Sequence, residues 1–444
     1  MKKKVLIISN LFHAFPRIPG ITVYFLDFGW KPVIVTPPLD ATYMDRLGFP
    51  EKFSEKVTLI QVPHKDIYWF VRKFLKLIGY KVEKYGHSNL TYQLKERLGI
   101  IQKKSYLDIL KNLYETFFGY PDGEILWKKP VLQALNKILR KEHFDALISS
   151  SPFPTVHLIA KELKRKFNLP WVADFRDLWT QNHYYLYPRW RKVFEKQLEL
   201  RTLSLADALV TVSSIWAEKL KIFHKRNTVY AITNGFDPEK VNIPPAKLTS
   251  KFTITYTGQI YIGQQDPNKL LIALHKLISK KVIDPKDIEV RFYGREEKWL
   301  KKEIEKYNLT SIVKQFGQVP REVALKKQWE SQILLLFNWE DSREKGLYTG
   351  KVFEYLAARR PILITGGYGG DVLEELIKET KSGVYCPKVE DVEEALKNFY
   401  LEYKQQGKVG YRGDWEKIKK YSYKEMARKF VEILNQIAKN EKQN

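Results

Sequence analysis

Short apolar runs alternate with helical patterns along most of this chain, and the alternation restricts the possible folds more than any other feature. Such a rhythm is typical of a parallel β-sheet with helices on both faces. In the first half, the strand-like runs lie at 4–9, 31–37, 57–63, 145–151, 170–175, 207–213 and 228–235. We therefore expect one doubly wound α/β domain there.

A polar, proline-containing segment at 242–251 then predicts a linker. After it the alternation begins again, with strand-like runs at 252–258, 288–294, 312–317, 332–338, 360–367 and 382–386. The last stretch has apolar residues at helical spacing and predicts a C-terminal helix packed back on the body. We expect Rossmann-like domains over 1–243 and 250–405, a helical insertion near 65–130, and a helical segment over 406–444.

The composition excludes several classes of protein. A single cysteine, Cys386, rules out a disulfide framework and a cysteine-rich zinc site, and it favours a reducing compartment, so we expect a cytoplasmic protein. The first apolar run ends before Asn10 and is too short for a signal sequence. No stretch approaches the roughly 20 apolar residues that cross a bilayer.

The charge is strongly basic, with 76 Lys and Arg against 51 Asp and Glu, a formal net charge of +25. Such a field attracts polyanions, namely nucleic acid, anionic lipid or diphosphate substrates. No zinc-finger spacing, RNP-like strand or repeat is present, so we do not expect nucleic-acid binding. A solvated Lys/Glu surface remains the simpler alternative.

Two doubly wound domains in series predict a cleft between them, because ligands of open α/β sheets sit at the carboxyl ends of the strands. Small or polar residues follow several predicted strands and would let backbone N–H groups approach an anion. They are Ser9–Asn10, Ser149–Ser151, Asp174–Trp179, Asn234–Gly235, Gly258–Gln259, Gly294–Arg295 and Gly317–Val319. Each alone is weak evidence, since strand-to-helix turns need glycine anyway.

The ordered motifs VTVSSIWAEKL, ITNGFDPEKV, ITYTGQI, VRFYG, FGQVP and KVFEYLAARRPIL resemble retaining glycosyltransferases of the GT-B fold, in particular family 4. The resemblance spans about residues 130 to 380. PDGEILWKKP, ISSSPFPTVHLIAKEL and WVADFRDLW resemble the subgroup that builds bacterial surface polysaccharides. The resemblance implies a cleft that binds a nucleotide-sugar in the second domain and a glycan or polyprenyl-diphosphate-linked acceptor in the first.

Within this resemblance, Glu354 matches the family's glutamate that accepts hydrogen bonds from the donor ribose. A carboxylate suits that role because it only accepts and ribose offers two O–H donors. Thr349 and Gly350 fall where backbone N–H groups meet the diphosphate at a helix N-terminus. Lys351 opposes the helix dipole there unless it has an anionic partner. A solvated helix glutamate is the alternative for Glu354.

The chain departs from the family pattern in two places. The family usually carries a glutamate where this chain has Gly346, and Glu344 is the candidate substitute for contact with the donor sugar. The family's Arg after the first strand of the second domain is Gln259 here, so the phosphate charge must be balanced elsewhere. Arg295 is one candidate, although it could pair with Glu296 or Glu297. Backbone at Gly258 and from Gly317 to Val319 would hold the rest of the donor.

In DFRDLW, we expect Asp174 and Arg176 to be catalytic, with Asp174 orienting or deprotonating the acceptor hydroxyl. An ion-paired strand end is the structural alternative, and His183 and His157 are alternative bases. The family needs no enzymatic nucleophile, because the acceptor attacks the face from which the diphosphate leaves. The sequence has no HxH, HExxH or DxD motif, so we expect no metal and no other cofactor.

Residues 67–85 combine aromatic and basic side chains and could form a helix on an anionic membrane, or one packed on its own domain. A membrane contact would make the protein peripheral to the inner face of the cell membrane. Two other functions stay open. One is a nucleotide-sugar-binding or scaffold protein without activity, favoured by Gly346 and Gln259. The other is a GT-B-like nucleotide-sugar epimerase.

Overall fold

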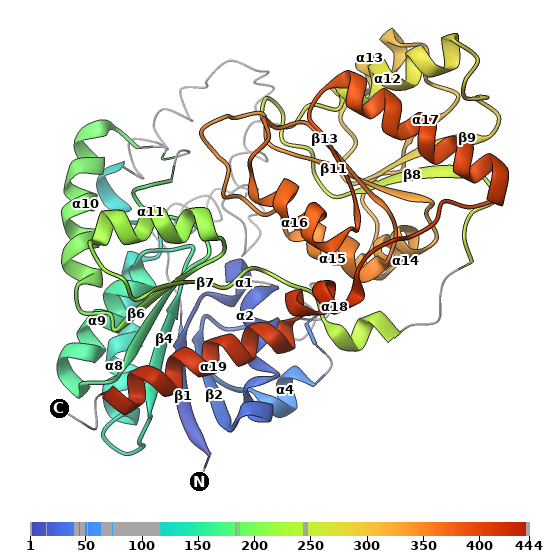
Figure 1. The fold of residues 1–444 in the computed structure, drawn as a ribbon. Helices are drawn as coiled ribbons and strands as arrows, with labels where there is room; N and C mark the ends of the chain where they lie inside the picture. Colours follow the sequence, from blue (N-terminus) through green and yellow to red (C-terminus); the bar gives the residue numbers. More distant parts are fainter. Residues whose placement is uncertain are drawn as a thin grey trace.

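The structure is a computed structural model that describes residues 2–14, 16–39, 44, 49–50, 52–63, 73, 116–182, 185, 187–242 and 247–440. Figure 1 shows two lobes, each built around one β-sheet with helices on both faces. The doubly wound arrangement predicted from the alternation is confirmed. Residues 67–85, apart from Lys73, lie outside the described residues, and so does His183.

The N-terminal lobe contains a seven-stranded sheet in the order β3-β2-β1-β4-β5-β6-β7, and every neighbouring pair is parallel. All seven strands coincide with the predicted apolar runs. Their bounds are β1 Lys3–Ile8, β2 Trp30–Thr36, β3 Thr58–Gln61, β4 Ala146–Ser150, β5 Trp171–Phe175, β6 Ala208–Thr211 and β7 Val229–Ala231. The order reverses between β1 and β4, and polar strand ends gather beside this point.

The C-terminal lobe contains a six-stranded parallel sheet in the order β10-β9-β8-β11-β12-β13. The strands are β8 Phe252–Thr257, β9 Ile288–Tyr293, β10 Val313–Gln315, β11 Ile333–Phe337, β12 Ile362–Thr365 and β13 Gly383–Cys386. All five residues of β11 are buried, as continuous apolar strands in covered sheets are. The prediction of a second doubly wound unit is therefore also confirmed.

Helices of the N-terminal lobe pack on the two faces of its sheet and form two separate hydrophobic clusters there. They are α1 Leu11–Ala14, α2 Arg17–Thr22, α4 Phe53–Lys56, α8 Lys128–Ile138, α9 Thr155–Phe167, α10 Arg189–Leu203 and α11 Ser214–His224, with the 3-10 turns η1 Phe25–Phe28 and η2 Ile125–Trp127.

In the C-terminal lobe, two further clusters lie on the two faces of the second sheet. The helices are α12 Asn268–Ser279, α13 Lys298–Lys306, α14 Arg321–Trp329, α15 Gly350–Ala358, α16 Val372–Thr380 and α17 Val389–Gln406. The segments between the lobes add η3 Pro238–Asn242, α18 Trp415–Ile418 and η4 Lys419–Tyr421.

The last helix, α19 (Tyr423–Asn440), returns to the N-terminal lobe, as predicted. Figure 1 shows it lying along that lobe beside α2. Met426, Phe430 and Leu434 repeat every four residues and are almost fully buried in the core beneath β1. Burial of this stripe holds the C-terminal segment against the first sheet.

The chain passes between the lobes after Gly235 and again before Tyr423, and these two connecting segments are hydrogen-bonded to each other. Tyr423 donates its backbone N–H to the carbonyl of Phe236 at 2.8 Å, and Phe236 donates to the carbonyl of Tyr421 at 3.2 Å. A Cβ on Gly235 would lie 2.4 Å from the Tyr421 carbonyl oxygen, so glycine permits this contact. The two sheets lie on either side of these crossing segments (Figure 1). Among the described residues, no helix is long and apolar enough to cross a membrane.

Candidate functional site

A cleft of about 790 Å³ opens at the carboxyl ends of β8 and β9, in the C-terminal lobe. Its floor is made by Gly258 and Gly294, whose backbones touch: a Cβ on Gly294 would lie 2.2 Å from the Gly258 carbonyl oxygen. Gly294 also donates to the carbonyl of Gly317 at 3.0 Å. The structure therefore brings together the predicted residues Gly258, Gln259, Arg295 and Val319 as lining, with Gly317 directly behind them.

Arg295, beside this floor, is half exposed and its Nε lies 3.8 Å from Oε1 of Glu297. The pairing considered in the sequence is thus present, but the distance is long and solvent reaches the guanidinium. Such a contact is weak.

Lys351, in the first turn of α15, extends under the cleft floor. Its Nζ donates to the Tyr256 hydroxyl at 2.8 Å and to the Gln259 carbonyl at 3.2 Å, and it lies 4.7 Å from the centre of the Tyr256 ring. Its stem passes Gly258 so closely that a Cβ there would lie 2.3 Å from Cε. Burial lowers the pKa of the Lys351 ammonium to about 8, and Glu354 partly offsets the shift.

Thr349 and Gly350 form the start of α15, one residue before Lys351. Thr349, the N-cap residue, has extended backbone geometry and makes no side-chain capping hydrogen bond. Its buried Oγ1 has no hydrogen-bond partner among the described residues. Gly350 is exposed, and a Cβ added there would meet nothing within 4 Å. The helix start thus has open space above Gly350, and a helix N-terminus has a dipole that favours an anion.

Glu354 lies one turn further along α15 and forms an ion pair that the sequence did not predict. Its Oε1 is 2.7 Å from Nη2 of Arg321, the first residue of α14. Gln328 donates to its Oε2 at 3.5 Å. Glu354 is therefore neither core nor a solvated helix residue: its carboxylate, about one fifth exposed, faces a small cavity between the lobes.

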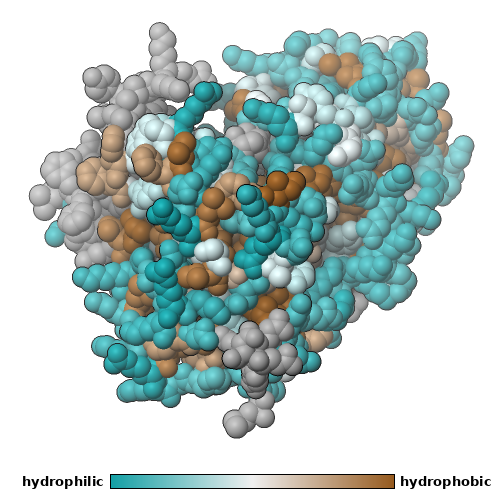
Figure 2. Space-filling view, turned by 60° about the vertical axis from the view of Figure 1, so that its left-hand side comes forward, coloured by the Kyte–Doolittle hydropathy of each residue, from teal (hydrophilic) through white to brown (hydrophobic). Residues whose placement is uncertain are grey.

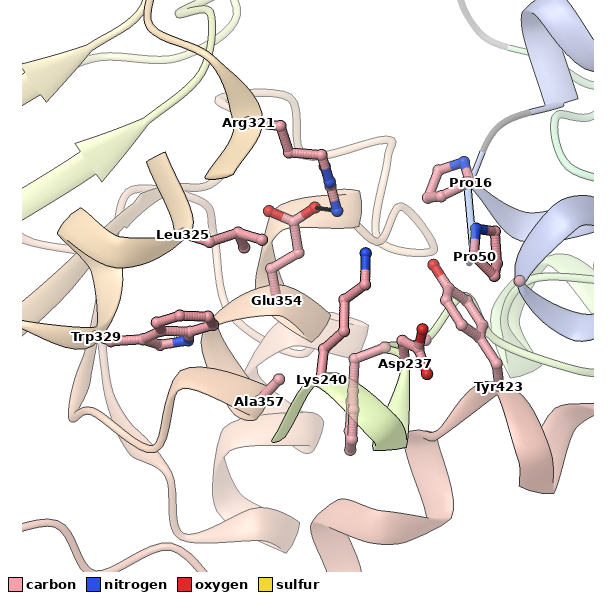
Figure 3. Close-up of a pocket in the computed structure, with 13 residues that line it drawn as sticks. Pro16, Pro50, Asp237, Lys240, Arg321, Leu325, Trp329, Glu354, Ala357 and Tyr423 are labelled. Atoms are coloured by element: carbon pink, nitrogen blue, oxygen red, sulfur yellow. Dashed lines mark ion pairs between the residues drawn. The ribbon is translucent and has the colours of Figure 1, made fainter. Parts of the chain in front are cut away.

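That cavity, of about 50 Å³, is shown in Figure 3, where Glu354 and Arg321 face each other and Lys240 points toward them. Pro16, Pro50 and Tyr423 stand on the opposite side, from the N-terminal lobe and α19. Lys240 and Arg321 line both this cavity and the larger cleft. Within the described ranges, no carboxylate lies at ion-pair distance from Lys240, so this cation has charge to offer a ligand.

Glu344, the candidate for contact with a donor sugar, is buried at the interface between the lobes. Its Oε1 accepts hydrogen bonds from the Trp216 indole and from the Gly346 backbone N–H, both at 2.9 Å. A Cβ on Gly346 would lie 2.3 Å from Trp216 Cδ1. Trp216 therefore fills the space that a side chain at 346 would need, which explains the glycine there.

Asp174, at the end of β5, is fully buried and both of its carboxylate oxygens are engaged. Oδ1 and Oδ2 accept from the guanidinium of Arg17 at 3.0 and 3.2 Å, and Oδ2 accepts from the Ser150 hydroxyl at 2.7 Å. Arg17 in turn donates to the Thr233 carbonyl at 2.6 Å. This geometry favours a role in positioning strand ends over direct proton transfer, and it corresponds to the structural alternative of an ion-paired strand end, with Arg17 rather than Arg176 as partner.

Arg176 lies next to this pair at the mouth of the N-terminal lobe. It donates to the His13 carbonyl, and its backbone N–H donates to Ser151 Oγ at 3.1 Å. Burial lowers its pKa from the usual value, while Asp177 opposes the shift.

His157 is fully buried, and burial lowers its pKa to about 3, so its imidazole is neutral. Its Nδ1 lies 2.8 Å from Ser149 Oγ and its ring stacks on Phe175 at 4.7 Å. This histidine is packed within the core, and its burial argues against a role as a base.

Comparison with protein families matches residues 110–240 to Glycosyltransferase Family 4. A comparison with curated protein sequences gives no match. Among solved structures, HepE from Anabaena, in complex with UDP and glucose, has a TM-score of 0.59 at 10% identity, covering 98% of this chain and 100% of that one. A TarM variant from S. aureus, solved with UDP and alpha-GlcNAc-glycerol, has a TM-score of 0.57 at 11% identity, covering 98% and 100%. A glycosyltransferase from Rickettsia africae has a TM-score of 0.55 at 16% identity, covering 99% of both chains.

The two facing doubly wound lobes are thus the GT-B architecture. Residues 110–240, part of the N-terminal lobe, are similar to Glycosyltransferase Family 4, and the fold of the whole chain is that of GT-B glycosyltransferase structures.

Proposed function

We propose that the protein is a retaining glycosyltransferase that moves a sugar from a nucleotide-sugar to a glycan or lipid-linked acceptor during surface polysaccharide synthesis. The observation that carries the proposal is Lys351, a half-buried lysine beside an open helix N-terminus. Among the described residues, its ammonium contacts a hydroxyl, a carbonyl and an aromatic ring. A buried cation with neutral partners is costly unless it meets an anion.

A donor diphosphate would supply that anion. Above Thr349 and Gly350, its oxygens would accept backbone hydrogen bonds at the helix start, with the Lys351 ammonium beneath. Lys240 and Arg295 supply further positive charge along the same cleft. Charge balance by these groups and the helix dipole, without a metal, is part of the proposal.

Glu354 would accept the ribose hydroxyls, and Arg321 holds its carboxylate in place. The base would lie against the backbone from Gly317 to Val319, at the edge of the cleft. Two of the similar structures contain UDP, HepE with glucose and TarM with alpha-GlcNAc-glycerol, which supports a nucleoside diphosphate as the donor's leaving group here.

On the N-terminal side, the Arg17–Asp174 pair would fix the strand ends, and Arg176 would face the acceptor. In the proposed reaction, the donor's anomeric C–O bond to phosphate breaks and a bond to the acceptor oxygen forms on the same face. The acceptor's proton passes to the departing diphosphate oxygen. Charge stabilisation of that oxygen would then be the main catalytic contribution.

The role in surface polysaccharide synthesis rests on the motif resemblance, and one similar structure is a lipopolysaccharide outer core galactosyltransferase, WaaB, with a TM-score of 0.53 at 12% identity. We further propose a cytoplasmic protein at the inner face of the cell membrane, where lipid-linked acceptors lie.

A thermal-shift screen across nucleoside diphosphates and their sugars tests the donor site. A true donor at 100 times its dissociation constant stabilises by roughly 2.7 kcal/mol. NMR of the product then reports the anomeric configuration, which must equal that of the donor. An inverted product would overturn the retaining mechanism.

The other two functions predict different outcomes of the same assays. If the protein binds a nucleotide but turns over no nucleotide-sugar, even with a lipid acceptor, it is a binding protein without activity. Conversion of the nucleotide-sugar without an acceptor to an epimeric sugar would assign an epimerase. Either result would replace the transferase proposal.

A further inference from the structure

The outer face of α10 combines exposed aromatic and basic side chains. Trp190, Val193 and Phe194 are 49%, 61% and 63% exposed, and Val193 and Phe194 follow Trp190 by three and four positions, so both lie beside it on one face of the helix. Phe117 is 66% exposed, and its ring lies 6.2 Å from that of Trp190. We call these four residues the α10 patch. Large apolar side chains gathered in this way mark an interaction surface.

The charges of α10 are sorted between its two faces. Both acids of the helix, Glu195 and Glu199, are buried. Glu195 pairs with the buried Arg191 at 2.6 Å, and Glu199 accepts from the Thr180 backbone at 3.1 Å. The inward face therefore neutralises the acids, and the outward face retains no negative charge from this helix.

The cations of α10, in contrast, mostly face outward. Arg189, Lys196 and Arg201 are exposed, and Lys192 is half-buried with its Nζ 5.2 Å from the Tyr185 ring centre. In the part of the chain that the structure describes, none of these four has a carboxylate at ion-pair distance. Figure 2 shows hydrophobic side chains interspersed with hydrophilic ones on the side of the molecule that carries α10.

We infer that the α10 patch docks on an anionic lipid bilayer. Aromatic rings that reach the boundary between headgroups and acyl chains, flanked by unpaired cations, are the chemistry of an interfacial helix. Each Lys or Arg close to an anionic surface contributes about 1 kcal/mol of attraction. A nucleic acid would match the cations but leave the apolar side chains Val193 and Phe194 without a partner.

Hydrogen bonds connect the α10 patch to the segment that follows β5 in the N-terminal lobe. Glu195 accepts a hydrogen bond from the Trp179 indole at 2.8 Å, and Trp179 ends the DFRDLW segment that begins with Asp174 and Arg176. Arg191 donates to the carbonyls of Gly119 and Pro121 at 2.7 and 2.9 Å and so fixes the loop that carries Phe117. Docking through α10 would bring this side of the cleft to the surface where a lipid-linked acceptor lies. The inference extends the proposed function, but vesicle binding does not depend on it.

Vesicle flotation of the full chain tests the inference, with vesicles of phosphatidylglycerol and phosphatidylcholine against vesicles of phosphatidylcholine alone. We expect wild type to float with the anionic vesicles and less so at higher salt. Trp190→Ser with Phe194→Ser, and separately Lys196→Glu, should each weaken binding on the order of tenfold. The matched controls are Ile222→Ser on α11, 77% exposed, and Lys301→Glu on α13, 73% exposed; both should bind like wild type.

Equal binding by the patch variants and wild type, or no binding of wild type to anionic vesicles, would overturn the inference. If wild type is a dimer that does not bind vesicles, and the patch variants are monomers, the patch is an interface with a second copy of the chain. If wild type binds DNA but not vesicles, and Lys196→Glu loses the DNA binding, the patch binds nucleic acid. If Trp190 of lipid-free wild type does not react with a water-soluble tryptophan reagent, another segment of the chain covers the patch, and the inference is overturned.

The same samples separate this inference from the proposed function. The thermal shift with nucleoside diphosphate, measured without vesicles, should be equal in wild type and in the patch variants. If no protein shows that shift but wild type still floats, the proposed function fails and the docking surface stands. If the shift is present and flotation is absent, the reverse holds.

Discussion

The indole N–H of Trp216 donates to Oε1 of Glu344 at 2.9 Å, and this hydrogen bond joins the two lobes. Trp216 belongs to α11 of the first lobe, and Glu344 belongs to the segment between β11 and α15 of the second. Because the same oxygen accepts the Gly346 backbone N–H, the segment that leads to Thr349 and Lys351 is fixed to α11. The position of the start of α15 thus depends on a contact across the cleft.

Gly346→Ala should disturb this contact, because its Cβ would lie 2.3 Å from Trp216 Cδ1 and 2.6 Å from Nε1. We expect a loss of about 1–3 kcal/mol in the free energy of unfolding, as overpacked sites show. Urea unfolding measures it. Gly350→Ala is the matched control, since nothing lies within 4 Å of its added Cβ, and it should leave stability unchanged or raise it. Equal stability of the two variants would contradict the role given to Trp216.

Glu354→Gln should weaken nucleoside diphosphate binding by roughly tenfold to a hundredfold, because hydrogen bonds to a charged acceptor contribute about 1.5–3 kcal/mol. The effect on folding should be small, since the Arg321–Glu354 pair is 33% and 22% exposed and such pairs contribute at most about 1 kcal/mol. Calorimetric titration measures the affinity. Glu305→Gln, on exposed α13, is the control. Unchanged affinity of Glu354→Gln would remove Glu354 from the donor site.

The strands of both sheets were predictable from the sequence, because buried parallel strands consist of continuous apolar runs. The runs at 252–258 and 332–338, for example, contain β8 and β11. The position of the cleft followed from the same rule, since parallel strands place Gly258, Gly294 and Gly317 at one edge. Periodicity alone therefore fixed most of the architecture.

The partners of the site residues were not predictable, because they come from distant parts of the chain. Arg17 meets Asp174 across 157 positions, and Trp216 meets Glu344 across 128. A single sequence carries no signal for such pairs. Arg321 directly follows the motif FGQVP, and Lys240 lies within ITNGFDPEKV, so both could have been suspected as cations of the cleft.

One motif that supported the resemblance has a structural explanation. Asp122 of PDGEILWKKP is fully buried and accepts the Thr155 backbone N–H at 2.6 Å and the Thr155 hydroxyl at 2.9 Å. Burial raises the pKa of this carboxyl to about 7, although the hydrogen bonds to Thr155 oppose the shift. The side chain fastens the start of α9 and does not face the cleft.

Asp174→Ala should cost about 3–5 kcal/mol of unfolding free energy, because it leaves the Arg17 guanidinium, 1% exposed, without its carboxylate. The double variant Arg17→Met with Asp174→Leu removes both charges and should lose less than the sum of the two single changes. Urea unfolding of the three variants measures this. The thermal shift with nucleoside diphosphate should persist in any variant that folds, since the pair lies in the other lobe. Loss of that shift in the folded double variant would contradict a role confined to the acceptor side.

The pKa of about 8 for Lys351 makes donor binding proton-linked. Between about pH 8 and the ordinary value of 10.5, the unfolded chain binds a proton that the folded protein does not, so this group's contribution to stability rises with pH there. A bound diphosphate favours the charged ammonium and raises its pKa. Binding at pH 8.5 should therefore take up a fraction of a proton, at most roughly three quarters, because roughly a quarter of the Lys351 side chains are already protonated at that pH.

Calorimetric titration at pH 8.5 in two buffers of different ionisation enthalpy measures that uptake. Lys351→Met should abolish it, weaken nucleoside diphosphate binding, and leave the unliganded protein about as stable at pH 7, because it removes a partly desolvated charge whose hydrogen-bond partners among the described residues are neutral. Lys301→Met, at an exposed position, should keep the uptake of wild type. Equal heats in both buffers for wild type would mean that the Lys351 ammonium does not meet the phosphates.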